Sequence, residues 1–196
     1  VPEFNGLHLV DRDELRYLKF TDRELSPRVE HGRQALAIDE ERAESLYDAM
    51  GPAVEVSGGS CGNTMAGIAS FGGKGAYVGK VKQDQLGSVF GHDLKSIGVA
   101  FDTPQATSGP STARCLIMVT PDAQRTMNTY LGACTGLGPS DIDPGVVGAA
   151  QVTYVEGYLW EAPEAKKAVL KAFDAAHAAG RLVSITLSDS FCVGRY

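Results

Sequence analysis

The chain has 196 residues, of which 43% are hydrophobic and 21% are charged, and its formal net charge is −6. This composition is typical of a globular protein that forms one domain or most of a larger one. The acidic balance disfavours nucleic acid or an anionic membrane surface as a partner, because both require a basic face. No apolar run approaches the roughly 18 residues that cross a bilayer, and no signal-peptide pattern is visible at the N-terminus.

Residues 1–37 differ from the rest of the chain. Thirteen of these 37 residues are charged, no long apolar period is present, and only the stretch LHLV resembles a strand. We therefore treat 1–37 as an atypical N-terminal segment and expect the folded domain to begin at residue 38.

From residue 38 onward, helical and strand-like segments alternate. The stretch DEERAESLYDAMG predicts a helix that Asp39 caps and Gly51 ends. The stretch AYVGKV at 76–81 is typical of a strand, and DQLGSVFGHDLKSIG predicts a second helix with Asp84 as its N-cap. The runs RCLIMVT and RTMNTY flank a Pro-Asp pair, which is a favoured turn, so we expect a β-hairpin over 114–130.

The last third of the chain predicts a βαβ unit. VTYV is typical of a short buried strand, and PEAKKAVLKAFDAAHAAG has the clearest helical periodicity of the chain. LVSITL then has the continuous apolar character of a strand in a parallel sheet. Strand, helix and strand at this spacing predict an α/β fold with a parallel sheet.

The stretch EVSGGSCGNTMAGIASFGG contains the main candidate for a binding site. We expect a strand to end near Val56, a turn at Gly58 and Gly59, and a helix from about Asn63. Ligands of open α/β sheets bind beyond the carboxyl ends of strands, and two residues without Cβ allow a ligand to touch the main chain. The alternative interpretation is that the glycines only form a tight turn and that Asn63 only caps the helix.

Other site chemistry is not indicated by the sequence. Neither the phosphate-binding pattern GxxxxGK[ST] nor the dinucleotide pattern GxGxxG occurs. The four cysteines are far apart and form no CxxC pair, so we expect reduced thiols, a cytoplasmic protein and no metal site.

Several motifs in the right order resemble a known family. GGSCGNTMAGIASFGGKGAYVGKVKQDQLG resembles the first signature of the PfkB-type carbohydrate kinases of the ribokinase-like superfamily. TARCLIMVTPDAQRTMNTYLGAC, VTYVEGYLW and AHAAGRLVSITLSDSFCV resemble the adenosine-kinase-like bacterial branch. The resemblance covers roughly 38–196 and implies a ribokinase-like three-layer α/β sandwich with a parallel central sheet and a small β lid. It also implies ATP and Mg²⁺ as cofactors and phosphorylation of a sugar or nucleoside hydroxyl.

The resemblance assigns acceptor-binding roles to five residues, which are Gly58, Gly59, Asn63, Asn128 and Glu156. The first three fall where the family holds sugar hydroxyls, and Asn128 falls on a lid built from 76–81 and 114–130. Glu156 falls where the family often places a carboxylate near the sugar. The alternative for Glu156 is a solvated charge at a strand end; we favour the site role because the adjacent Gly157 suggests a close backbone approach.

The departures from the family are as informative as the matches. The usual first strand is not recognisable in 1–37, and the Gly-Ala-Gly-Asp loop that supplies the family's catalytic base does not occur. We therefore expect the N-terminal substrate half of a kinase, truncated at the C-terminus, with no catalytic residue in this chain. The alternative is a non-catalytic truncated or degenerate homologue that binds a small molecule at most. An unpaired sheet edge or the lid would also allow a homodimer.

Overall fold

The computed structural model describes residues 34–119 and 121–195, which divide into two compact units. Of the described residues, one unit combines 34–53 with 113–119 and 121–132, and the other combines 54–112 with 133–195. The boundary expected at residue 38 stays a prediction. The strand expected at LHLV lies outside the described residues.

The first unit contains a three-stranded sheet in the order β1-β3-β2. Its strands are β1 (Gln34–Ala37), β2 (Arg114–Val119) and β3 (Arg125–Tyr130). β2 and β3 pair antiparallel, which confirms the predicted hairpin, and β1 pairs parallel with β3. β1 was not expected, since the sequence places 34–37 in the atypical segment.

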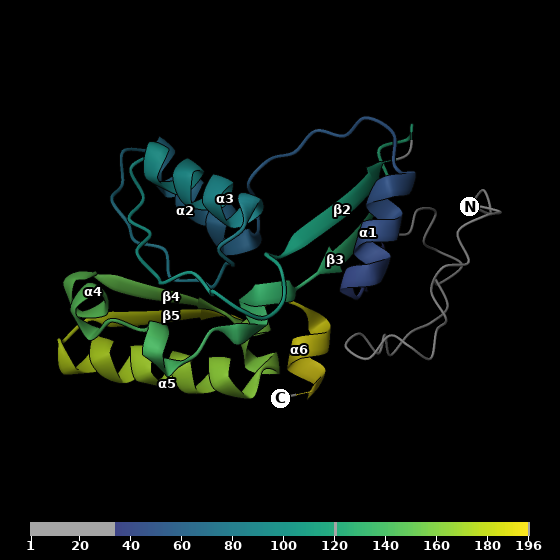
Figure 1. Ribbon diagram of the computed structural model, residues 1–196. Coiled ribbons are helices and arrows are strands. Elements are labelled where there is room, and N and C mark those ends of the chain that lie inside the picture. The colour runs from purple at the N-terminus through teal and green to yellow at the C-terminus, as the bar shows by residue number, and fades with distance from the viewer. Residues whose placement is uncertain (1–33, 120, 196) are drawn as a thin grey trace. The chain divides into compact units, whose positions relative to one another are not determined.

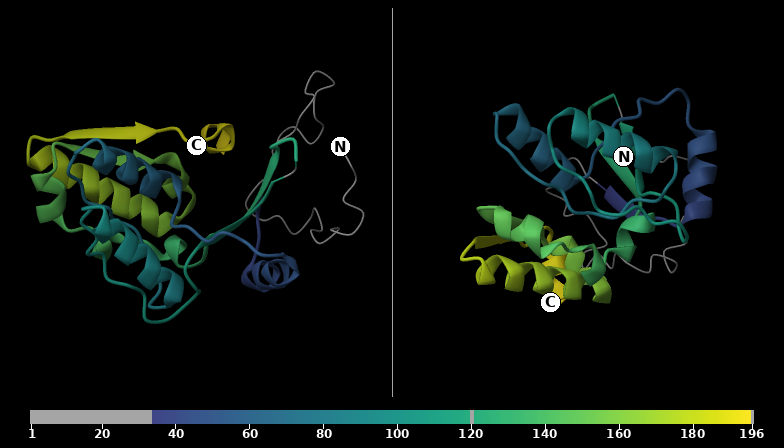
Figure 2. Two further views of the ribbon diagram at one scale, coloured as in Figure 1. Left: turned by 90° about the horizontal axis from the view of Figure 1, so that it is seen from above. Right: turned by 60° about the vertical axis from the view of Figure 1, so that its left-hand side comes forward.

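Helix α1 (Glu40–Ala49) lies alongside the hairpin, as Figures 1 and 2 show. The predicted cap is confirmed: Asp39 Oδ1 accepts a hydrogen bond of 2.8 Å from the backbone N–H of Arg42. Ala43 and Leu46, one helical turn apart, are both buried. An amphipathic helix thus covers the hairpin through its apolar stripe.

The second unit begins with two helices, α2 (Ser60–Ser70) and α3 (Gln85–Ser96). The predicted cap of α3 is confirmed, because Asp84 Oδ1 accepts a hydrogen bond of 2.8 Å from the N–H of Gly87. Beside these helices, the rings of Tyr77, Phe90 and Phe101 pack edge to face with centroids 5.4–5.7 Å apart. Such aromatic pairs add stability beyond the area that they bury.

The segment 76–81 is not a strand of the hairpin sheet. It belongs to the second unit, where Ala76 forms a single parallel bridge with Ala100. The physical reason is side-chain burial: Val81 is buried and Tyr77 packs against the same apolar cluster, which also contains Val99. These contacts hold the segment against α3 and its following loop, so it cannot pair with the hairpin.

The predicted βαβ unit is confirmed. β4 (Val152–Glu156) and β5 (Leu182–Thr186) pair in parallel, and α5 (Pro163–Ala178) connects them. Figure 1 shows α5 running along the two strands. The remaining elements are α4 (Pro144–Ala149), α6 (Ser190–Arg195) and 3₁₀ turns at Gly132–Gly136, Pro139–Asp141 and Gly157–Glu161.

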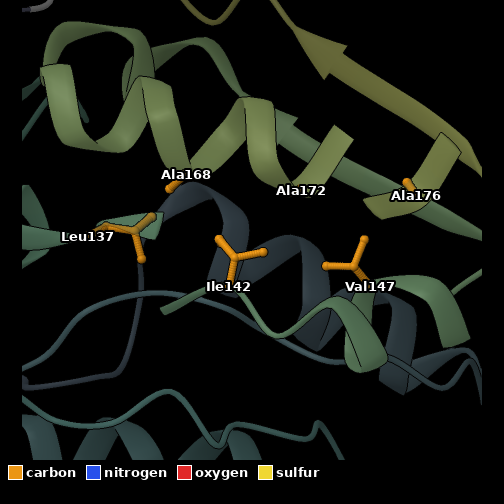
Figure 3. Packing of buried hydrophobic residues seen from close by; sticks show 6 residues of the cluster. All are labelled: Leu137, Ile142, Val147, Ala168, Ala172 and Ala176. Atoms are coloured by element: carbon orange, nitrogen blue, oxygen red, sulfur yellow. The ribbon is translucent and has the colours of Figure 1, made fainter. Parts of the chain in front are cut away.

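A core of small and branched side chains joins α5 to the segment that precedes β4. Its buried members are Leu137, Ile142, Val147, Ala168, Ala172 and Ala176. Figure 3 shows that the three alanines, spaced four residues apart on α5, face the three larger side chains. Small residues at this spacing let the helix approach closely, which fixes α5 and hence the strands that it connects.

Candidate functional site

The glycine pair lies in an irregular segment directly before α2. Residues 51–59 contain no strand, so the strand expected near Val56 does not form, and Val56 remains exposed. Gly59 is the N-cap of α2 and has φ = +87°, a left-handed conformation that favours glycine. Asn63 is the fourth residue of the helix, and its N–H donates to the Gly59 carbonyl over 2.8 Å. Asn63 therefore does not cap the helix. It is an exposed residue in the first turn.

A cavity of about 390 Å³ lies beside this first turn. Its lining residues are Glu55, Val56, Ser57, Gly58, Gly62, Asn63, Ala66, Phe90, Asp93, Leu94, Ser96 and Ile97. Gly58 and Asn63 line this cavity, whereas Gly59 does not. Its walls are α2, α3 and the 55–58 segment instead of the expected strand ends. The acceptor-binding role of these residues stays a prediction.

The cavity combines an apolar wall with a polar rim. Phe90 and Leu94 of α3 supply the apolar surface. At the rim, Ser57 Oγ donates to Asp93 Oδ2 over 2.5 Å. This hydrogen bond lowers the pKa of Asp93, and a hydrogen bond from His92 makes the next largest contribution, so the carboxylate stays charged. Small-molecule sites typically have this combination of an apolar surface and a few oriented polar groups.

Glu156 ends β4 and reaches the start of α2. Its Oε2 accepts a hydrogen bond of 2.5 Å from Ser60 Oγ, which joins positions 96 residues apart in the sequence. Glu156 does not line the cavity itself, nor does Gly59. Because the N-terminus of a helix carries a partial positive charge, the carboxylate is favourably placed there.

Gly157 shows the close backbone approach expected from the sequence. A Cβ at this position would lie 2.9 Å from the carbonyl oxygens of Thr186 and Leu187. Any larger residue would push the ends of β4 and β5 apart. Glycine at 157 therefore keeps Glu156 at the carboxyl end of two adjacent strands.

Burial and the charge of Glu156 affect the pKa values of Cys61 and Tyr77. Burial, and then the charge of Glu156, raises the pKa of the Cys61 thiol to about 11. Burial also raises the pKa of Tyr77, with further contributions from Cys61, Cys134 and Glu156. Cys61 is consequently a neutral thiol at physiological pH and is not an activated nucleophile.

Asn128 lies in the other unit and is turned inward. Its side chain is buried, and Nδ2 donates to the carbonyl of Leu116 on the neighbouring strand over 3.3 Å. The amide therefore helps to hold the hairpin together. A role of Asn128 in acceptor binding stays a prediction.

Metal-binding groups and membrane-spanning helices can be assessed only in the part of the chain that the structure describes. Within 34–119 and 121–195, no three His, Cys, Asp or Glu side chains are grouped so that they could hold a metal ion. None of the helices in these ranges is long and apolar enough to cross a membrane. All four cysteines, Cys61, Cys115, Cys134 and Cys192, are free thiols.

Comparison with known proteins decides the family. Residues 35–192 match the family described as "pfkB family carbohydrate kinase". The chain belongs to the pfkB family. It is 56% identical to the adenosine kinase from Sinorhizobium meliloti, with a TM-score of 0.78 over 83% of this chain and 50% of that one. It is 57% identical to a probable sugar kinase protein from Rhizobium etli, with a TM-score of 0.77 over 82% of this chain and 48% of that one.

More distant relatives include a probable fructokinase-4 of Arabidopsis thaliana, which is 29% identical over 142 residues. That match covers 71% of this chain and 43% of the relative. The structural likeness to the adenosine kinase and the probable sugar kinase confirms the α/β ribokinase-like fold expected from the sequence. The chain spans about half the length of the adenosine kinase and sugar kinase that it resembles.

Ser60 and the pocket residues on α3 were missed by sequence reasoning. The signal for Ser60 was a hydroxyl residue between the glycine pair and Asn63, at the first position of the helix. No local pattern could have linked it to Glu156, because that contact depends on how the βαβ unit packs beside α2.

Proposed function

We propose that this protein acts in the ATP-dependent phosphorylation of a nucleoside or sugar hydroxyl, with adenosine as the leading acceptor, and that this chain binds the acceptor. The observation that carries the proposal is the grouping at the start of α2. Gly58 and Asn63 border a cavity there, and Ser60 bonds to Glu156. The 56% identity to an adenosine kinase supports adenosine as the first acceptor to test, and the 57% identity to a probable sugar kinase supports a sugar as the second.

The chemistry of these groups suits a polyhydroxylated ligand with a flat ring. A carboxylate such as Glu156 accepts hydrogen bonds only, and an amide such as Asn63 both donates and accepts, so together they match hydroxyl groups. The exposed backbone at Gly58 permits a close approach. Phe90 and Leu94 offer an apolar surface for a ring.

The family implies ATP and Mg²⁺ as cofactors, and our proposal places their binding residues outside this chain. Mg²⁺ in such enzymes is commonly held by one or two carboxylates together with substrate phosphates. We assign no ATP-binding or Mg²⁺-binding residue among 34–119 and 121–195. In a full kinase, ATP would supply the phosphoryl group, and the role of this chain is to bind and orient the acceptor hydroxyl.

A binding experiment tests the acceptor site. The ¹⁵N-labelled chain is titrated with adenosine and, separately, with D-fructose, and backbone amide shifts are followed by NMR. We expect adenosine to shift the amides of Gly58, Gly59 and Asn63, and Asn63→Ala to weaken binding. Adenosine shifts that fall elsewhere, or no shifts with either ligand, would contradict the proposed site.

A second experiment separates a kinase from a homologue that only binds. Joining this chain to the part of the S. meliloti adenosine kinase that it does not cover should give adenosine-dependent ADP release, whereas this chain alone should give none. A chimera that folds and binds adenosine without turnover would favour the non-catalytic alternative. Circular dichroism checks the fold of both proteins.

A further inference from the structure

We propose that Ser60 is a positioning residue of the acceptor site: its hydroxyl holds the Glu156 carboxylate in the orientation that receives a ligand hydroxyl. This inference rests on the proposed function, because it assumes that Glu156 contacts the acceptor. It adds a residue and a role that neither the glycine motif nor the family match assigns.

The geometry of the contact carries the first step. Ser60 Oγ and Glu156 Oε2 lie 2.5 Å apart, so the hydroxyl donates a hydrogen bond to the carboxylate. Among the described residues, Ser60 is the one hydrogen-bond donor to this carboxylate. Glu156 has several rotatable bonds, and this hydrogen bond removes part of that freedom.

The second step concerns the freedom of each partner. Ser60 is the first residue of α2, and the positive φ of Gly59 determines how the chain enters the helix. Serine has one side-chain torsion before its hydroxyl, so Oγ occupies one of a few staggered positions relative to that backbone. Glu156 has more such torsions, so the hydrogen bond restricts its carboxylate more than it restricts Ser60.

The third step concerns what remains free on the carboxylate. Two carboxylate oxygens offer about four acceptor directions, and Ser60 uses one of them on Oε2. The others can accept hydrogen bonds from vicinal hydroxyls of a ribose or another sugar. Gly58 lies two residues before Ser60 and Asn63 lies three residues after it, and both line the cavity, so the proposed ligand would extend from the cavity toward Glu156.

The test measures adenosine binding to the full chain and its variants by isothermal titration calorimetry. Ser60→Ala should weaken adenosine binding by about tenfold, as expected for a lost hydrogen bond to a charged group. Ser60→Thr, which keeps the hydroxyl, should restore binding to within about threefold of the original chain. The double variant Ser60→Ala, Glu156→Gln should bind no more weakly than Glu156→Gln alone, since the two residues act as a unit.

Ser70→Ala is the matched control on the same helix. Ser70 Oγ donates to the Gly67 carbonyl over 2.7 Å at the far end of α2, so this variant loses a serine hydrogen bond without touching Glu156. It should bind adenosine like the original chain. Circular dichroism of each variant reports whether the overall helix content is unchanged.

The possible outcomes distinguish failure of the inference from failure of the proposed function. Normal adenosine binding by Ser60→Ala would overturn the inference and leave the acceptor site standing. Failure of Ser60→Thr to restore binding in a folded protein would also overturn it, because the hydroxyl would then not be the group that matters. If the original chain binds neither adenosine nor D-fructose, the acceptor site itself is overturned, and the inference with it.

Discussion

The ion pair between Lys80 and Asp141 anchors the 76–81 segment, and its removal should destabilise the protein markedly. Lys80 Nζ lies 2.5 Å from Asp141 Oδ1, and the two side chains are only 17% and 4% exposed. The other carboxylate oxygen accepts a hydrogen bond of 3.0 Å from the N–H of Gly138. Lys80→Met keeps most of the apolar stem and leaves the buried carboxylate without its counter-charge.

The magnitude follows from the burial of each partner. Breaking a fully buried pair by removing one partner costs about 3–5 kcal/mol. Lys80 retains some exposure, so water can partly solvate Asp141 in the variant, and the bond from Gly138 persists. We therefore expect Lys80→Met to lower the free energy of unfolding by about 2–3 kcal/mol, below the fully buried range. That is a large part of the total stability of a typical domain.

Urea unfolding at neutral pH, followed by circular dichroism, measures the effect. The matched control is Lys95→Met, because Lys95 and Asp102 lie 3.7 Å apart with side chains 60% and 81% exposed. An exposed pair of this kind should contribute less than about 1 kcal/mol. Adding Asp141→Leu to Lys80→Met should recover part of the loss, since no unpaired charge then remains buried. Equal effects of Lys80→Met and Lys95→Met would refute the reasoning.

Two further predictions concern steric space and thiol reactivity. Gly87→Ala should destabilise the chain by about 1–3 kcal/mol in thermal unfolding, because the new Cβ would collide with the backbone carbonyl of Lys82. Gly67→Ala has open space around the new Cβ and should be neutral or stabilising by up to about 1 kcal/mol. Equal effects would contradict this difference. Cys61 and Cys134 both have pKa values raised to about 11, so iodoacetamide should modify them slowly at neutral pH and faster as the pH rises toward that value. Glu156→Gln should move the pH profile of Cys61 modification to lower pH, because the charge of Glu156 contributes to the raised pKa of that thiol. The profile of Cys134 should not change, because burial alone raises its pKa. Equal shifts of the two profiles in peptide mass spectrometry would disprove the contribution of Glu156.

The features that sequence reasoning predicted correctly depend on residues close together in the chain. The capping aspartates, Asp39 and Asp84, accept from backbone groups three residues ahead, so a short pattern contains the whole interaction. The βαβ order around α5 follows equally from local periodicity. The glycine at 59 is required by its own positive φ.

Only the tertiary structure decided which distant residues meet. Ser60 and Glu156 are 96 positions apart, and their contact exists because β4 ends beside the start of α2. The 76–81 segment has the composition of a strand, yet the burial of Tyr77 and Val81 places it against an apolar cluster. The type of a residue determines which hydrogen bonds and ion pairs its side chain can form. The packing of distant elements determines which partner it contacts. For this chain, the sequence determined the family and its local elements, and the tertiary structure determined how Glu156 is held, because that contact depends on the packing of a whole βαβ unit.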